Sequence, residues 1–240
     1  ENKKYLTLSD KNRIREWKLP PTRGNIVDYF GNVIAGNLKV YQLHIIPEQV
    51  ENFNYLLTRL KTLLQLSDKK ILKILKLKKK LKPWESIIVS ENLSWSQFLK
   101  VNNYLYDLAG AKPVMTISRN YPFNHIYTHV LGYVSQPNED DILQNEVIQQ
   151  RFVPGMKVGK LGLEKTLENY LIGKNAIQRY EVNAYGKRIN QLEYQKGEQG
   201  SKIRLTVDTE VQKLSAKLLA DKAGSISVMD IYTGDVVAMY

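Results

Sequence analysis

Residues 20–37 read PPTRGNIVDYFGNVIAGN, and this stretch decides the fold that we predict for the chain. β-Forming residues stand on both sides of Gly31 and before Gly36, which is the pattern of two strands joined by a tight turn. The stretch contains no recognisable nucleophile, metal-binding group or phosphate-binding loop. We therefore predict a hairpin with a structural role rather than a catalytic one.

The composition is that of a folded protein with an excess of positive charge. The chain has 240 residues, 43% of them hydrophobic, which is enough for one large or two smaller domains. Its formal net charge is +11, carried by 26 Lys and 9 Arg. A lysine-rich surface suits diffuse attraction to anionic lipid, polysaccharide or nucleic-acid backbone, whereas base-specific readers use arginine. The absence of cysteine excludes disulfides, thiolate catalysis and Cys-ligated zinc.

The pattern changes from strand to helix after residue 46. Apolar residues in 50–64 recur at intervals of three and four, which predicts an amphipathic helix. Ser67 and Asp68 predict the N-cap of a second helix that runs to about Leu77, and Pro83 ends it. This helical pair is interpreted as a small insertion between strands.

The remaining segments alternate between the two kinds of structure. Helices are predicted, weakly for the first of them, over 1–17, 94–108, 139–153, 159–174 and 209–222. Strands are predicted over 25–34, 38–46, 87–89, 114–117, 129–136, 180–182, 188–192, 203–207, 225–231 and 235–239. Residues 196–202 have the composition of a linker. The predicted fold class is α+β.

Three short patterns match the motifs of active-serine penicillin-recognising enzymes. Ser67 and Lys70 fit Ser-x-x-Lys, Ser90 begins a Ser-x-Asn, and 157–159 half-fits Lys-Ser/Thr-Gly. The chemistry requires the lysine to lie buried beside the serine, yet Lys70 stands in a basic, solvated stretch. A chain this rich in serine and lysine also produces such matches by chance. We interpret all three as coincidences.

Two further features are weighed against ordinary structural roles. His125 and His129 lie four residues apart, but no third metal ligand is evident, so core or surface histidines are favoured. Residues 69–82 hold eight lysines. A solvated helix face is the favoured interpretation, and contact with an anionic membrane or polymer is the first alternative. Nucleic acid is a weaker third option, because no aromatic residues interleave with these lysines.

Four blocks, in order along the chain, resemble the non-catalytic part of class B penicillin-binding proteins, and most closely the elongation-specific branch of peptidoglycan D,D-transpeptidases. They are LSDKNRIREWKLPPTRGNIVDYFGNVIAGN (8–37), RNYPFNHIYTHVLGYVS (119–135), GKLGLEKTLENYLIGKNAIQRYEVNAYGKRI (159–189) and LTVDTEVQKLSAKLLADKAGSISVMDIYTGDVVAMY (205–240). The chain departs from the family at Tyr29 and Phe30, where the family has Arg-Asn, and at Asn175, where it often has glycine.

The resemblance implies structural roles for the residues that match the family's motifs. They are Arg23, Gly24, Asp28, Gly31, Arg119, Tyr121, Pro122, His129, Gly132, Tyr133, Gly162, Glu164, Gly173, Glu181 and Gly186. Glycines of the hairpin allow backbone turns that other residues resist. Arg23 and Asp28 are expected to pair and to fix the hairpin. No catalytic residue, metal or cofactor is implied within the chain.

The resemblance also implies a domain organisation. Residues 1–17 would be a juxtamembrane segment, 18–48 and 133–200 the two parts of a pedestal of the dimerisation type, and 49–132 an inserted head subdomain. Residues 201–240 would begin a transpeptidase domain. The family's catalytic Ser-x-x-Lys helix would follow Tyr240, so these 240 residues are expected to be inactive although the parent protein would be an enzyme.

The parent protein would cross-link peptidoglycan during rod-shape elongation and would be acylated by β-lactams. The resemblance implies a helix upstream of Glu1 that anchors it in the cytoplasmic membrane, with this region on the periplasmic side. The implied partners are a RodA-type glycosyltransferase, the scaffold protein MreC and peptidoglycan, without nucleic acid. For this region we predict a scaffold and partner-binding role. The alternatives are the pedestal of a division-specific relative, a complete transpeptidase acting through Ser67, and a basic module that binds anionic polymer.

Overall fold

A computed structural model describes residues 14–81, 83, 85–153, 155–182 and 188–240 of the chain. The chain forms two compact units, which we describe separately. The first unit comprises Glu1–Asn37 and Arg119–Tyr240, and the second unit comprises Leu38–Ser118. No helix among the described residues combines the length and the apolar character that crossing a membrane requires.

The second unit packs helices against strands around one apolar core. Its elements are the end of β3 (Val33–Ile45), η1 (Pro47–Gln49), α2 (Phe53–Leu64), α3 (Asp68–Lys80), β4 (Ile87–Leu93), α4 (Trp95–Asn103), η2 (Leu105–Asp107) and most of β5 (Ala111–Asn120). β4 is antiparallel to β3, and β5 also pairs with β3. Leu43, Leu56, Leu60 and Ile74 are among the buried core residues. Both helices that the periodicity of 50–77 predicts are confirmed.

Local capping explains where α2 and α4 begin. The side chain of Asn52 accepts a hydrogen bond from the backbone N–H of Tyr55 at the start of α2. Ser94 and Gln97 exchange side-chain and backbone hydrogen bonds as a capping box at the start of α4. Ser67 occupies the N-cap position of α3, although its side chain makes no capping bond there.

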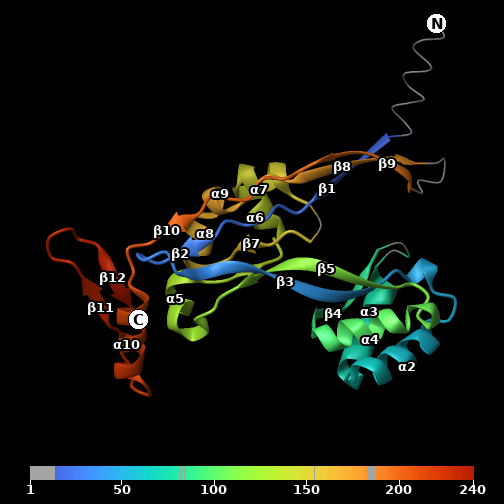
Figure 1. The fold of residues 1–240 in the computed structure, drawn as a ribbon, viewed down its shortest axis with the longest axis horizontal. Coiled ribbons are helices and arrows are strands. Elements are labelled where there is room, and N and C mark those ends of the chain that lie inside the picture. Colours follow the sequence, from blue (N-terminus) through green and yellow to red (C-terminus); the bar gives the residue numbers. More distant parts are fainter. Residues whose placement is uncertain (1–13, 82, 84, 154, 183–187) are drawn as a thin grey trace, which may run out of the picture. The chain divides into compact units, whose positions relative to one another are not determined.

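The first unit contains two main sheets (Figure 1). β1 (Ile14–Leu19), β8 (Ala176–Val182) and β9 (Arg188–Gln195) form an antiparallel sheet with β8 in the middle. β2 (Ile26–Val27) pairs with the start of β3 on one side and, in parallel, with β10 (Ile203–Arg204) on the other. The predicted hairpin of 20–37 is therefore confirmed, with the turn at Gly31, whose φ is +92°.

Short helices and strands complete the first unit. They are η3 (Asn124–Tyr127), α5 (Thr128–Leu131), β6 (Val134–Ser135), α6 (Glu139–Gln144), α7 (Glu146–Arg151), β7 (Val158–Gly159), α8 (Gly162–Thr166), α9 (Glu168–Leu171), α10 (Thr209–Leu219), β11 (Ser227–Met229) and β12 (Val236–Met239). β6 pairs with β7, and β11 pairs with β12. Ile26, Ile34, Tyr127, Leu131 and Leu171 belong to one buried cluster.

Two predicted elements are wrong, and two predicted strands have the wrong bounds. The predicted strands 25–34 and 38–46 leave a break at 35–37, but β3 runs through that stretch and the chain turns at 28–32 instead. Residues 14–17 belong to strand β1 rather than to a helix, because β1 pairs along its whole length with β8, which lies far away in the sequence. The predicted strand over 129–136 is a helix, α5, in its first part. Tyr127 and Leu131, four residues apart, both face the core, which is the spacing of a helix.

The compact units divide the chain at other points than the predicted domain boundaries. The units separate after Asn37 and after Ser118, whereas the sequence predicts boundaries after residues 48 and 132. The long strands β3 and β5 account for the difference, because each begins in one unit and ends in the other. The assignment of the segments to pedestal, head and transpeptidase domains stays a prediction.

Candidate functional site

Arg23, at the base of the hairpin, lies at the centre of a buried ion cluster in the first unit. Its Nε donates to Oε2 of Glu164 at 2.6 Å, and its Nη1 and Nη2 donate to the two carboxylate oxygens of Glu168 at 2.9 and 2.7 Å. The side chains of Glu164 and Glu168 are no more than 4% exposed. Burial alone would lower the pKa of the Arg23 guanidinium, but Glu168 and Glu164 outweigh it and raise that pKa.

Arg119 adds the second positive charge to this cluster. Its Nε donates to Oε1 of Glu164 at 2.7 Å, and its Nη1 donates to the backbone oxygen of Gly24 at 2.6 Å. The Tyr121 hydroxyl donates to the same Glu164 oxygen at 3.3 Å. Burial and the charge of Glu164 raise the pKa of the Tyr121 phenol, so it stays a hydrogen-bond donor. Two guanidinium groups thus balance two carboxylates.

Two short helices present the carboxylates to the hairpin. Glu164 lies in α8 and Glu168 begins α9, and Leu167 separates the two helices. The Glu168 carboxylate also accepts the backbone N–H of Gly159 in β7 at 2.9 Å. The cluster therefore connects the hairpin to Arg119 and to the segment 159–168.

The predicted ion pair between Arg23 and Asp28 is wrong. Asp28, which is fully buried, accepts hydrogen bonds from the backbone N–H and the side-chain amide of Asn32 at 2.7 and 2.9 Å. It also accepts one from the Thr209 hydroxyl at 2.6 Å, and that hydroxyl in turn accepts from Tyr127 at 3.0 Å. Asp28 thus fixes the turn to the first residue of α10 through neutral donors, and the buried carboxylates of α8 and α9 take its place beside Arg23.

The environment of Asp28 shifts its acidity. Burial would raise the pKa of this carboxyl group, but the hydrogen bonds from Thr209 and Asn32 outweigh burial and hold the pKa below its ordinary value. Because the folded-state pKa is depressed, the group stabilises the folded state above the unfolded pKa of about 3.9, and this contribution is lost as the pH falls through the folded pKa.

We expect Asp28→Asn to lower the free energy of unfolding by about 2 kcal/mol at neutral pH, because an amide cannot accept all three bonds as a charged group does. The deficit relative to the wild type should shrink below about pH 4, where the wild-type carboxylate also becomes protonated. Urea denaturation at a series of pH values measures both effects. Asp221→Asn is the control, since Asp221 is exposed. A deficit that stayed constant down to pH 2, at roughly its neutral value, would contradict the assignment.

Close backbone contacts account for two of the predicted glycines. A Cβ on Gly132, whose φ is +72°, would lie 2.0 Å from the backbone oxygen of Leu161, just before α8. A Cβ on Gly24 would lie 2.0 Å from the backbone oxygen of Ser201, and the N–H of Gly24 donates to Leu171. These positions let the hairpin, α5 and the start of α8 approach within a distance that a side chain would prevent.

The structure does not bring all predicted motif residues into the cluster. Pro122, His129 and Tyr133 are exposed, and Glu181 lies half-buried in β8 opposite Ile14 of β1. Gly173 touches the 198–200 segment through its backbone. Gly186 lies outside the described residues. The prediction missed Glu168, Thr209 and Tyr127. For Glu168 there was a signal, since it lies four residues after Glu164 and could share its side of a helix.

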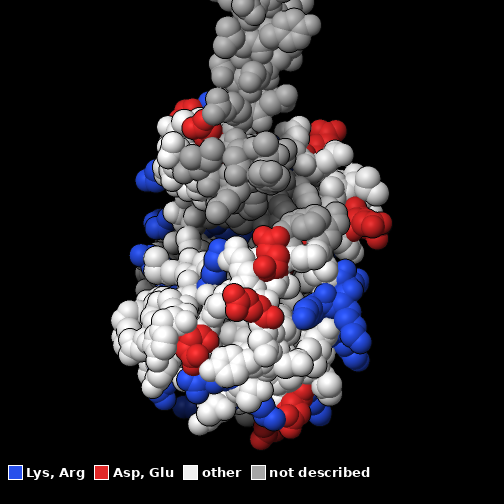
Figure 2. All heavy atoms as spheres, turned by 90° about the vertical axis from the view of Figure 1, so that its right-hand side faces the viewer, with Lys and Arg blue, Asp and Glu red and all other residues white. Residues whose placement is uncertain are grey.

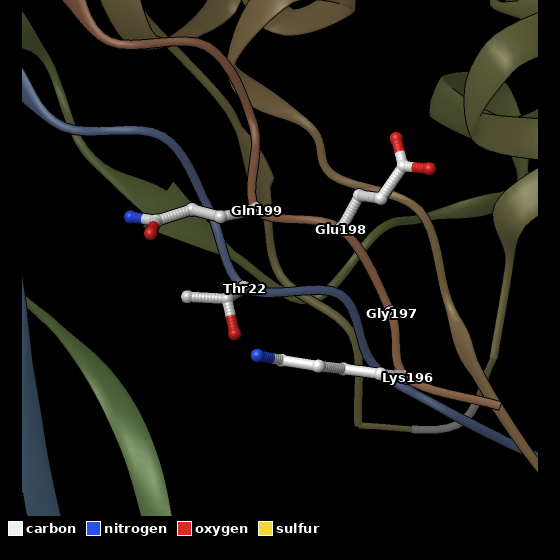
Figure 3. Close-up of a pocket in the computed structure, with 5 residues that line it drawn as sticks. All are labelled: Thr22, Lys196, Gly197, Glu198 and Gln199. Atoms are coloured by element: carbon white, nitrogen blue, oxygen red, sulfur yellow. The ribbon is translucent and has the colours of Figure 1, made fainter. Parts of the chain in front are cut away.

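A shallow cavity of about 530 Å³ opens beside the chain segment that leads into the hairpin. It is lined by Thr22 and by residues 196–199 (Figure 3). The Lys196 side chain extends toward Thr22, whereas the Glu198 carboxylate points away from them. Apart from Gly197, the residues that line the cavity have polar or charged side chains.

The sequence patterns with possible catalytic or metal-binding roles lie elsewhere. Ser67 and Lys70 are both exposed at the start of α3, so Lys70 is not buried beside the serine as acyl transfer requires. His125 and His129 are exposed on η3 and α5. Among the described residues, no group of three or more His, Asp or Glu side chains could hold a metal ion.

Buried charges lock the hairpin onto short helices and strands in the first unit, and comparisons with known proteins identify the family of this fold. The family model of the penicillin-binding protein dimerisation domain matches residues 18–205. The chain belongs to this family. Peptidoglycan D,D-transpeptidase MrdA of Haemophilus influenzae is 33% identical over 239 residues, which cover 98% of this chain and 36% of the relative.

Two more similarities point the same way. MrdA of Escherichia coli K12 is 33% identical over 237 residues, which cover 98% of this chain and 37% of the relative. A solved complex between penicillin-binding protein PBP2 and MreC from Helicobacter pylori matches with a TM-score of 0.76 at 26% identity, covering 95% of this chain and 42% of that one. The chain thus spans little more than a third of the length of the MrdA relatives.

Proposed function

We propose that the chain is the non-catalytic region of a penicillin-binding peptidoglycan D,D-transpeptidase that cross-links the cell wall during rod-shape elongation. The similarity to MrdA over 98% of the chain carries this proposal. The parent protein would be anchored in the cytoplasmic membrane and would place this region on the periplasmic side. Its catalytic serine would attack the D-Ala-D-Ala end of a stem peptide, and this region would act as its scaffold.

The proposed partners are MreC and a RodA-type glycosyltransferase. The PBP2 of the H. pylori complex was solved together with MreC, which supports an MreC partner for this chain. The candidate partner surface within the first unit is the sheet β1–β8–β9. Leu192 and Tyr194, two residues apart on β9, are each 52% exposed. Exposed apolar side chains on an edge strand are a common feature of docking surfaces.

The test is size-exclusion chromatography of the chain with the periplasmic domain of MreC from the same organism. We expect co-elution at tens of micromolar, and we expect Leu192→Asp/Tyr194→Asp to abolish it. The matched control is Ile231→Asp/Tyr232→Asp, which places the same charges on side chains that are 87% and 91% exposed outside the sheet. Failure of the wild-type chain to co-elute would contradict the MreC proposal, and equal loss in both variants would contradict the choice of surface.

A further inference from the structure

Helix α3 of the second unit carries a row of lysines that nothing in its own fold explains. Lys69, Lys73, Lys76 and Lys80 follow one another at intervals of four, three and four residues, so they lie along one side of the helix. All four side chains are exposed. At a rise of about 1.5 Å per residue the row is roughly 16 Å long. We call these four residues the lysine row.

The lysine row lacks compensating negative charge among the described residues. The helix has one acidic residue, Asp68, and that carboxylate pairs with Lys61 at 2.5 Å. Lys78 lies on another side of the helix, with its amine 4.1 Å from the centre of the Phe53 ring. No ion pair within 4 Å is found for any member of the row in the described ranges. Figure 2 shows lysine and arginine side chains gathered at the right-hand edge of the face it displays.

The packing of α3 argues against insertion into a membrane. A helix that lies in a bilayer surface turns an apolar face toward the acyl chains. In α3, Ile71, Ile74, Leu75 and Leu77 all pack on the core of the second unit. Only Leu72, which is 59% exposed, points an apolar side chain outward from this helix. The exposed side of α3 therefore offers a line of charges without an apolar face.

An exposed line of ammonium groups suits an extended anionic ligand. A helix face is convex and has no walls, so it selects for charge spacing rather than for shape. Lysine, as a hydrated point charge on a flexible stem, tolerates variable anion positions better than a bidentate arginine would. In nascent peptidoglycan, each stem peptide that is not cross-linked ends in a carboxylate, so a glycan strand carries anions along its length.

We propose that the lysine row of α3 binds the anionic stem peptides of nascent peptidoglycan and holds a glycan strand on the second unit. This inference rests on the proposed function, which supplies the polymer, and adds the surface that would receive it. The attraction is electrostatic, so it weakens with salt.

The experiment is co-sedimentation of the 240-residue chain with protein-free peptidoglycan sacculi. The variant is Lys69→Gln/Lys73→Gln/Lys76→Gln/Lys80→Gln. The matched control, Lys39→Gln/Lys100→Gln/Lys112→Gln/Lys222→Gln, removes the same charge from exposed lysines outside α3. We expect the lysine-row variant to bind about tenfold more weakly or worse, and the control to bind like the wild type. Wild-type binding should fall between about 50 and about 200 mM NaCl.

Three results would overturn the inference. Equal loss in the two variants would mean that net charge alone attracts the polymer. Unchanged binding of the lysine-row variant would place the polymer elsewhere. If the lysine-row variant lost binding to vesicles of equal parts phosphatidylglycerol and phosphatidylcholine but still bound sacculi, α3 would be a membrane contact instead. Circular dichroism confirms that both variants fold, and co-elution with MreC tests the proposed function independently of all three results.

Discussion

Glu164→Ala is expected to lower the free energy of unfolding by about 3–5 kcal/mol, because it leaves buried guanidinium groups without their shared carboxylate. Glu164 accepts from Nε of Arg23 at 2.6 Å and from Nε of Arg119 at 2.7 Å, and the two arginine side chains are 9% and 3% exposed. Neither charge can reach water without opening the junction between the hairpin and α8. Urea denaturation followed by circular dichroism measures the change.

An exposed ion pair provides the control for this substitution. Glu210 pairs with Lys213 at 2.7 Å, but its side chain is 80% exposed. Glu210→Ala should therefore cost no more than about 1 kcal/mol. Glu164→Gln keeps the size of the side chain and removes its charge, so its effect should fall between those two. If Glu164→Ala and Glu210→Ala proved equally mild, the buried cluster would not be what holds the hairpin to α8.

Gly132→Ala should lower the free energy of unfolding by a similar amount, about 3–5 kcal/mol, for a steric reason. The added Cβ would lie 2.0 Å from the backbone oxygen of Leu161 and 2.3 Å from its carbonyl carbon. Backbone atoms cannot move aside as the tip of a flexible side chain can. The positive φ of +72° adds a conformational cost for any residue with a Cβ.

Gly31→Ala separates these two contributions, because Gly31 also has a positive φ, +92°, but has no atom within 4 Å of the added Cβ. Its expected cost is only the conformational part, about 1–2 kcal/mol. The difference between the two variants, measured by the same denaturation experiment, then reports the close approach of α5 to the segment before α8. Equal effects at Gly132 and Gly31 would refute the steric account.

Local patterns predicted a large part of this fold. The hairpin of 20–37 and the helices α2 and α3 follow from turn glycines and from apolar spacing within about a dozen residues. The same reasoning failed where a partner elsewhere in the chain decides the structure. β1 is a strand because β8, more than 150 residues later, pairs with it. In α5, the positions that face the core depend on the cluster around Ile26 and Leu171.

For the candidate site, the sequence likewise predicted the residues but not the contacts between them. The resemblance singled out Arg23, Arg119, Tyr121 and Glu164, and the structure places all four in one cluster. Which of them would touch was not predictable, because the contacts span 141 residues between Arg23 and Glu164 and 181 between Asp28 and Thr209. The expected pairing of Arg23 with the neighbouring Asp28 was wrong because it considered only local separation.

The sequence by itself determined the α+β class, the hairpin, the helical pair of the second unit and the family to which the chain belongs. Only the tertiary structure decided the partners of the buried charges and the residues on the open surfaces. The physical reason is the cost of burying a charge. A guanidinium group removed from water must meet whichever carboxylates the completed fold brings beside it, and sequence proximity does not choose them.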